Sequence, residues 1–463
     1  MAGTFIRNRL LPRVAVGLSG GVDSSVAALL LLEQGYEVIG VHMQNWDTTD
    51  EAGASACPYT EDLRDAEAVS KQLGIPFHRV DFCRPYWTHV FTPFLEEYDK
   101  GLTPNPDILC NREIKFDRFQ GFARDVVGTP WIATGHYARL RHFPSLGPSL
   151  PVGPLPSSTS EGGPRNARAC TGSHSSLPEL CTGMDEAKDQ SYFLSQVPTR
   201  AFQHVLFPLG HLRKGQVRDM AHAAGLCTAE KKESMGICFV GKRRMGAFLP
   251  EYLQPRAGTF VSVTTGEVLG TQEGALTLLT VGQGARIGGA EEKWFVCGKD
   301  MEAGRIYVAP GTDHPALYCD WLLVAKEDFN WIGQAPWEMG KKHEDRSQPT
   351  DRLPSTASPS VAFRCEYRAR YRQPLAGCQV STSSDHPGML RVDFDVPQRG
   401  VALSQTLALY AGERCLGGGA IVEVGPSYYA QGKRLPEKRL TWAVSGGKRC
   451  VAEARGGEES PRA

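Results

Sequence analysis

Residues 14–35 read VAVGLSGGVDSSVAALLLLEQG, and this stretch decides how the rest of the chain is interpreted. Its apolar start at 14–18 predicts a buried strand. The apolar residues that then recur every three or four positions predict a helix that ends at Gly35. Between the two, Gly20 and Gly21 allow the backbone to approach a bound group closely. Such a strand, loop and helix present free backbone N–H groups and a positive dipole end to an anion. The stretch therefore predicts a phosphate-binding loop, with a plain tight turn as the alternative.

The side chains of this loop favour a nucleotide. Serine hydroxyls add donors, and Asp23 either caps the helix or helps to hold Mg²⁺. A Walker-type lysine is missing, which argues against a loop for γ-phosphate transfer. The segment SGGVDSS instead resembles the PP-loop of ATP pyrophosphatases, which implies ATP with Mg²⁺ and adenylation of a substrate oxygen. The residues assigned to the ATP site are Gly17, Leu18, Ser19, Gly20, Gly21, Val22, Asp23, Ser24, Met43 and Gly135.

Composition limits the classes of protein to consider. The 463 residues suffice for two or three domains with cores of their own. Because 51 basic residues balance 51 acidic ones, any contact with nucleic acid must come from local patches. No apolar run reaches about 18 residues, so no membrane span is expected. The 13 cysteines are scattered without a C-x-x-C pair, which argues against a disulfide framework or a zinc site, and no metal site is assigned.

The first domain is predicted to be an α/β fold with a doubly wound parallel sheet, because strands alternate with helices. The expected elements are strands at 37–43, 75–82 and 131–134 and a helix at 60–73. Ligands of such sheets bind beyond the carboxyl ends of the strands. That rule brings Met43, Gly135 and His136 to the phosphate loop. Met43 is expected to pack against adenine, Gly135 to admit the nucleotide, and His136 to meet a substrate unless it is structural.

The segment 101–119, GLTPNPDILCNREIKFDRF, is predicted to begin as an irregular loop because of its prolines. Asn105 and Asp107, on either side of Pro106, offer an amide and a carboxylate that suit the edge of a uracil-type base. Cys110 follows, with two cations close behind it that favour the thiolate.

A second cysteine, Cys238, lies within KKESMGICFVGKRR at 231–244. The five nearby cations favour a thiolate and an anionic RNA partner, although a solvated basic face is the alternative. Two isolated thiols in neighbouring domains can form a disulfide by exchange.

The remainder of the chain suggests two further domains. Strand-like alternation predicts a small central β-rich domain and then a C-terminal β-barrel, in which Arg368, Arg370 and Arg372 share one strand face that suits phosphate. The expected division is 1–206 for the PP-loop domain with an insertion at about 143–180, 207–304 for the central domain, 305–430 for the barrel with an insertion at about 338–360, and 431–463 for a loose tail.

Seven motifs together resemble the tRNA-specific 2-thiouridylase family, which converts the wobble uridine of certain tRNAs to 2-thiouridine. In order, they are GLSGGVDSS, TPNPDILCN, ATGHYAR, KDQSYFLSQ (188–196), SMGICFVGKR (234–243), RYRQ (370–373) and CLGGGAI (415–421). The resemblance covers about 13–425.

The resemblance implies roles for individual residues. Cys238 carries a persulfide received from a sulfur-donor protein. Cys110 then either releases sulfide from that persulfide or completes the exchange as a Cys110–Cys238 disulfide. The substrate is the anticodon stem-loop of tRNA, whose flipped uridine would sit on Asn105, Pro106 and Asp107. The other residues that would contact tRNA are His136, Lys188, Asp189, Gln190, Arg370, Tyr371 and Gln405.

Two rival functions remain at this point. One is a PP-loop enzyme that acts on a small molecule, and the other is an RNA-binding protein without activity. The chain is expected to be a monomer. Arg7, Arg9 and Arg13, with no acidic residue among the first 22 positions, suggest an import leader and a mitochondrial location. An ordinary basic arm is the alternative, with plastid or cytoplasm as the other locations.

Overall fold

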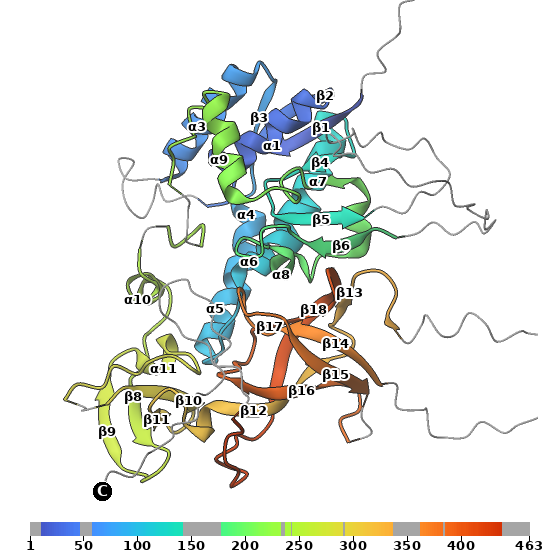
Figure 1. Ribbon diagram of the computed structural model, residues 1–463. Helices are drawn as coiled ribbons and strands as arrows, with labels where there is room; N and C mark the ends of the chain where they lie inside the picture. Colours follow the sequence, from blue (N-terminus) through green and yellow to red (C-terminus); the bar gives the residue numbers. More distant parts are fainter. Residues whose placement is uncertain are drawn as a thin grey trace, which may run out of the picture.

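The computed structural model describes most of the chain and contains three groups of strands (Figure 1). The described residues are 11–46, 58–141, 177–232, 237–241, 243–289, 292–336, 362–382 and 385–437. The predicted insertion at 338–360 lies outside them, as do Arg7, Arg9 and most of the insertion at 143–180 and of the tail. Among these residues, no helix has the length and apolar character needed to span a bilayer.

The first group is a five-stranded parallel sheet in the order β3-β2-β1-β4-β7. Its strands are β1 (Leu11–Gly17), β2 (Tyr36–Gln44), β3 (Phe77–Asp81), β4 (Ile132–Ala133) and β7 (Val205–Leu206). Helices α1 (Val22–Glu33) and α3 (Pro58–Leu73) pack on one face through the fully buried Val14 and Val16. Ala15 and Ile132 join the core on the other face. The predicted doubly wound sheet is confirmed.

Helix α9 (Lys214–Ala223) packs against α1, where Val217 and Ala221 share a core cluster with Val26. The helix therefore lies with the first sheet, although the sequence division had placed it in the central domain. Its amphipathic pattern could show a helix but not which domain it covers.

A helical run connects β3 to β4. It consists of α4 (Cys83–Tyr86), η1 (Trp87–Phe91), α5 (Thr92–Asp99), α6 (Pro106–Leu109), η2 (Cys110–Arg118), α7 (Phe119–Phe122) and η3 (Ala123–Val127). The prediction of an irregular loop is wrong from residue 106 onward, where the chain is helical. The Asn105 side chain caps α6 by accepting a hydrogen bond from the Asp107 N–H (3.2 Å), and Pro106 occupies the first helical position. Proline is compatible with that position because its N–H would be unpaired there in any case.

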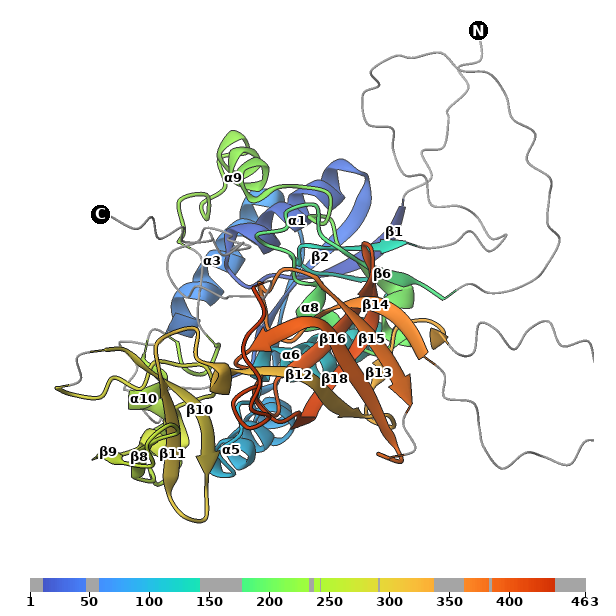
Figure 2. The same ribbon diagram turned by 60° about the horizontal axis from the view of Figure 1, so that its bottom comes forward.

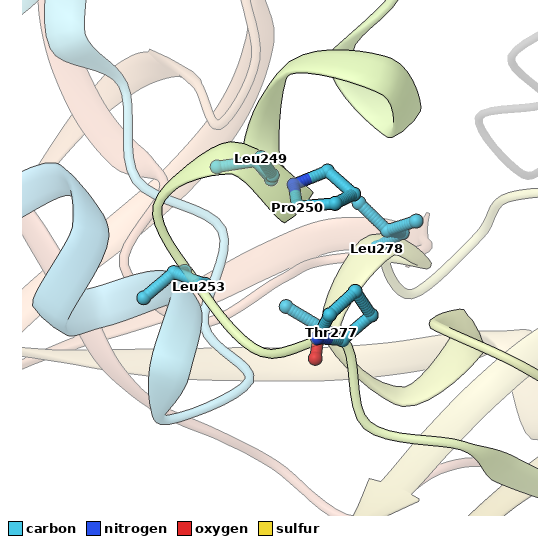
Figure 3. A pocket seen from close by; sticks show the side chains of 6 residues that line it. Leu249, Pro250, Leu253, Thr277 and Leu278 are labelled. Carbon is cyan, nitrogen blue, oxygen red and sulfur yellow. The ribbon is translucent and has the colours of Figure 1, made fainter.

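The central sheet has the strand order β10-β11-β8-β9. Its elements are α10 (Met245–Phe248), η5 (Leu249–Glu251), β8 (Gly258–Ser262), β9 (Val268–Gln272), α11 (Ala275–Leu278), β10 (Trp294–Asp300) and β11 (Arg305–Pro310). Both views show this sheet next to α5 (Figures 1 and 2). A hydrogen bond of 2.6 Å between the hydroxyls of Thr103 and Thr280 fastens the two parts together.

The third group contains the predicted C-terminal barrel, which is confirmed. Strand β12 pairs with both β16 and β18, and this closes the six strands β12-β16-β15-β14-β17-β18. Their bounds are β12 (Tyr318–Ala325), β14 (Ala362–Arg368), β15 (Ala376–Thr382), β16 (Met389–Arg399), β17 (Thr406–Ala411) and β18 (Arg414–Val424). Val380, Val392 and Leu407 are fully buried in its core.

Shorter elements complete the described chain. They are β5 (Ala138–Arg141), β6 (Glu179–Thr182), α8 (Ser191–Leu194), η4 (Thr199–His204), η6 (Pro315–Leu317) and β13 (Asn330–Trp331). Strands β5 and β6 leave the first domain and extend the barrel sheet through the pairing of Arg414 with Cys181. The first domain and the barrel are thus joined by backbone pairing as well as by side chains.

The prediction that Arg368, Arg370 and Arg372 share one strand face is wrong. Strand β14 ends at Arg368, and the chain then turns, with Arg372 in the left-handed region at φ 65°. The alternation of residue types extends past the end of the strand, so the three guanidinium groups do not share one face.

Candidate functional site

The phosphate loop is held in shape by its own serines. The Ser19 N–H donates to Ser24 Oγ (3.1 Å), and the hydroxyls of Ser24 and Ser25 donate to the Gly21 carbonyl (3.1 and 2.9 Å). Gly21 is the N-cap of α1 and has no side chain to satisfy the first N–H groups of the helix, which therefore suit an anion. Gly20 adopts φ 76°, and a Cβ there would clash with the backbone of Asp62.

Asp23 does not cap the helix, which decides against one of its two predicted roles. Its carboxylate accepts hydrogen bonds from Lys214 Nζ (2.7 and 2.8 Å) and from the Tyr137 hydroxyl (2.6 Å). Helix α9 thus supplies, from far along the chain, a cation beside a loop that has no Walker lysine. Sequence reasoning missed Lys214 because nothing local ties it to the loop.

The other residues assigned to ATP gather at the carboxyl ends of the strands, as the sheet rule predicts. A Cβ on Gly135 would lie 2.9 Å from the backbone of Asp23 and Ser24. Met43 Cε lies 3.1 Å from the position that a Cβ on Gly17 would occupy. The side chains of Leu18 and Val22 are buried in the core, so only their backbone can face a ligand.

His136 faces the protein core. Its ring lies 5.7 Å from the ring of Phe116 and 5.8 Å from that of Phe207, and its Nδ1 shares a hydrogen bond of 2.7 Å with Thr134 Oγ1. Burial, and then the charge of Lys115, lower the pKa of His136 well below its usual value. Such a buried, aromatic environment is expected if His136 has a structural role and does not meet a substrate.

The structure brings Cys110 and Cys238 together. Cys110 begins η2 and is buried, and Cys238 is an exposed residue in the turn that precedes α10. The two thiols are close enough that each shifts the pKa of the other, and burial and Cys238 together raise the pKa of Tyr86. Two cysteines far apart in the sequence therefore share one site.

The two thiols shift each other's pKa in opposite directions. The neighbouring Cys110 lowers the pKa of Cys238 to about 7, whereas Cys238 and burial raise the pKa of Cys110 well above its usual value. The sequence expectation for Cys110 is wrong in direction, because the opposing effect of Lys115 is smaller.

An aromatic cluster holds Cys238 in place. The next residue, Phe239, is buried against the rings of Phe91 (5.0 Å), Phe94 (5.0 Å) and Trp46 (5.6 Å). The aromatic residues between 82 and 98 are the sequence signal for this cluster, and periodicity alone did not reveal their common partner.

The turn expected to seat a base lies directly before Cys110. Pro106 is buried, and the oxygen of Asn105 is occupied by the cap of α6. Asp107 is half-buried, and burial raises its pKa, partly offset by Lys115. The Asp107 carboxyl is close enough to affect the pKa of Cys110 and of Cys238.

Two of the three residues at 188–190 point inward. Asp189 is buried in an ion pair with Arg368, and its carboxylate also accepts hydrogen bonds from the N–H of Gly183 (3.0 Å) and the N–H of Ser191 (3.1 Å). Gln190 Oε1 accepts from a backbone N–H at 3.0 Å. These contacts hold the segment against the barrel, and Lys188 beside them is half-buried.

The barrel residues assigned to tRNA lie where the three parts meet. Gln405 donates to the Thr103 carbonyl, close to the turn that precedes Cys110. The ring of Tyr371 packs 4.3 Å from that of Phe193.

Arg370 reaches from the barrel to the central domain. It donates to the Val281 carbonyl (3.1 Å), and burial, with the nearby charge of Arg399, lowers its pKa to about 10. The guanidinium therefore holds two parts of the molecule together at the same junction.

Comparisons with known proteins agree with this architecture. Residues 12–242 match the family described as tRNA methyl transferase HUP domain, 246–310 its PRC-barrel domain, and 350–421 the aminomethyltransferase beta-barrel domain. The tRNA-specific 2-thiouridylase MnmA 2 of Geobacillus kaustophilus is 43% identical over 89% of this chain and 95% of its own length.

Two vertebrate relatives are equally similar. Mitochondrial tRNA-specific 2-thiouridylase 1 of Danio rerio is 40% identical over 91% of this chain and 94% of its own. The protein of the same name in Mus musculus is 42% identical over 93% and 96%. With matches of this identity and extent, the chain belongs to the tRNA-specific 2-thiouridylase family.

Proposed function

We propose that this protein is a tRNA-uridine 2-sulfurtransferase, which uses ATP to convert the wobble uridine of tRNA to 2-thiouridine. The observation that carries the proposal is that Cys110 and Cys238, far apart in the sequence, lie together beside residues 105–107, in a chain that also has a PP-loop. The names of its relatives support the same substrate. Methyl transfer, named in the family descriptions, has no need of two thiols.

The residues of the loop fit ATP. The free N–H groups at the start of α1 would hold phosphate, and Met43 and Gly135 would border the rest of the nucleotide. Asp23 has the oxygen ligands that Mg²⁺ prefers, but Lys214 would have to move away from them. ATP supplies an activated uridine, because adenylation of the 2-carbonyl oxygen turns a poor leaving group into AMP.

The opposite pKa shifts of the two thiols, downward for Cys238 and upward for Cys110, favour a different task for each. The Cys238 thiolate is the nucleophile that takes the outer sulfur from the persulfide of a donor protein, which leaves as a thiolate. In one route the Cys238 persulfide attacks uridine C2 and AMP departs. Cys110 then attacks Cys238 Sγ, which frees 2-thiouridine and leaves a Cys110–Cys238 disulfide.

The second route leads to the same disulfide. Cys110 attacks the Cys238 persulfide first, and the released hydrosulfide then attacks C2. In both routes an external thiol must reduce the disulfide before the next turnover. The turn at 105–107 would seat the uridine, and extrusion of a base from a single-stranded loop costs only a few kcal/mol.

Mass spectrometry of tRNA nucleosides tests the proposal. Protein, ATP, Mg²⁺, unmodified tRNA and a persulfide donor should yield 2-thiouridine, and omission of ATP should abolish it. Cys110→Ser and Cys238→Ser should each abolish it as well, whereas Cys227→Ser, at an exposed cysteine, serves as the matched control. Full thiolation by both serine variants would refute the sulfur pathway, and pyrophosphate release that ignores tRNA would favour a small-molecule substrate.

We also propose a mitochondrial location and a monomer. The zebrafish and mouse relatives are named as mitochondrial proteins, and the arginine-rich, acid-free start of the chain suits import. Fractionation of cells that express the full chain distinguishes mitochondrion from plastid and cytoplasm, and sedimentation of the purified protein gives its oligomeric state.

A further inference from the structure

A second pair of cysteines lies in the barrel, where the proposed reaction does not use it. Cys365 on β14 and Cys378 on β15 are direct partners in the antiparallel register, and their sulfur atoms are 3.5 Å apart. Cys378 is fully buried, and Cys365 is partly exposed. The pair therefore has one thiol that solvent can reach and one that it cannot.

The backbone already has the geometry that a disulfide needs. Directly opposed residues of antiparallel strands have Cα atoms about 4.5–5.5 Å apart, inside the range of about 4.4–6.8 Å that disulfides span. The hydrogen bonds of β14 and β15 on both sides of the pair fix this register. Only side-chain rotation is required to bring the sulfur atoms into bonding distance.

We propose that Cys365 and Cys378 form a reversible disulfide site that reacts with low-molecular-weight disulfides such as glutathione disulfide, independently of Cys110 and Cys238. The Cys365 thiolate attacks one sulfur of the small disulfide and releases one small thiol. Cys378 then gives up its proton and attacks Cys365 Sγ, which releases the second small thiol. The two protein thiols are oxidised by two electrons, and the small disulfide is reduced to two thiols.

The order of attack follows from burial. Cys365 must react first because Cys378 has no exposed surface. The hydrogen bond with Cys365 and burial also raise the pKa of Cys378 far above its usual value, so that it acts only after its neighbour has reacted. Strand β14 ends at Arg368, the partner of Asp189, at the junction of the first domain, the central domain and the barrel. The disulfide would therefore stabilise the strand that leads into this junction.

Peptide mapping of the full-length protein tests the site. After incubation with glutathione disulfide and alkylation, we expect a peptide pair linked through Cys365 and Cys378 that dithiothreitol separates. Cys319 is the internal control, since it is buried on β12 of the same barrel but faces Gln398 across the strands, and it should remain a free thiol. The Cys110→Ser/Cys238→Ser double variant should form the same linked pair to the same extent.

Two single variants separate the steps. Cys378→Ser should accumulate glutathione on Cys365, because no second thiol can displace it. Cys365→Ser, at the partly exposed position, should leave Cys378 unmodified. The proposal is overturned if Cys365 and Cys378 both stay alkylatable in the folded protein, if Cys378 reacts without Cys365, or if the link requires Cys110 or Cys238.

Discussion

Replacement of Arg368 by methionine should destabilise the junction between the barrel and the first domain. Within the part of the chain that the structure describes, Arg368 is the charged partner of Asp189, and the side chain of Asp189 is only 1% exposed. The variant keeps the apolar stem but leaves a buried carboxylate with neutral donors from Gly183 and Ser191. Breaking a buried ion pair in this way costs about 3–5 kcal/mol. Loss of the guanidinium 5.2 Å above the Tyr410 ring acts in the same direction.

Calorimetry of the full chain measures the effect. For a cooperative unit of about 150–250 residues, a loss of this size lowers Tm by roughly 6–20 °C. Unfolding of several domains need not be two-state, so the comparison is between the same transition in each variant. Arg368→Lys is the matched control, because it keeps the charge and loses only the planar fork.

A double-mutant cycle shows whether the ion pair is the cause. Asp189→Asn alone leaves the guanidinium buried without its counter-charge and should also be strongly destabilising. The double variant, Asp189→Asn with Arg368→Met, should then lose less than the sum of the two, by about 1–3 kcal/mol. Additive losses, or an Arg368→Met variant as stable as the parent protein, would refute the assignment.

Three further predictions concern the nucleotide loop and the thiols. Alkylation of Cys238 should rise with pH around a midpoint of about 7, and Cys110→Ala should move that midpoint upward; an unchanged midpoint would contradict the role of the neighbouring Cys110. Lys214→Met should weaken the binding of a non-hydrolysable ATP analogue several-fold in calorimetric titration, with Lys214→Arg less affected, and equal affinities would count against the lysine. Gly20→Ala should abolish binding of the ATP analogue. Gly35→Ala, also at positive φ but with open space around it, is the control and should cost only about 1–2 kcal/mol of stability. If the two variants bind the analogue with the same affinity, the steric argument for Gly20 is excluded.

The parts of the fold that local patterns encode could be predicted from the sequence. The strand at 14–18 and the helix after it correspond to β1 and α1, because a short continuous apolar run predicts a buried strand and apolar residues at three- and four-residue spacings predict a helix. The parallel sheet followed from the alternation of such elements. The sheet type alone predicted that Met43 and Gly135 lie near the phosphate loop.

The failures involve partners that lie far away in the sequence. The cations after Cys110 predicted a low pKa, but Cys238 and the surrounding core reverse the direction. Asp189 was expected to face RNA, yet Arg368 from the barrel holds it inside. The prolines before Cys110 suggested a loop, although Asn105 and Pro106 start a helix. Residue type shows what a side chain can do, and only the tertiary partner decides which of those possibilities is realised.

The contact between the two thiols orders the proposed reaction. Cys110 lowers the pKa of Cys238, whereas Cys238 and burial raise the pKa of Cys110. Cys238 is also the exposed member of the pair, so it is the one that meets the donor persulfide. Once Cys238 Sγ is bonded to sulfur, it no longer carries the charge that opposes ionisation of Cys110, and the thiol that was held in reserve becomes the next nucleophile. The separation of roles thus comes from contact between the two thiols, and the aromatic rings packed around Phe239 hold the neighbouring Cys238 in position for it.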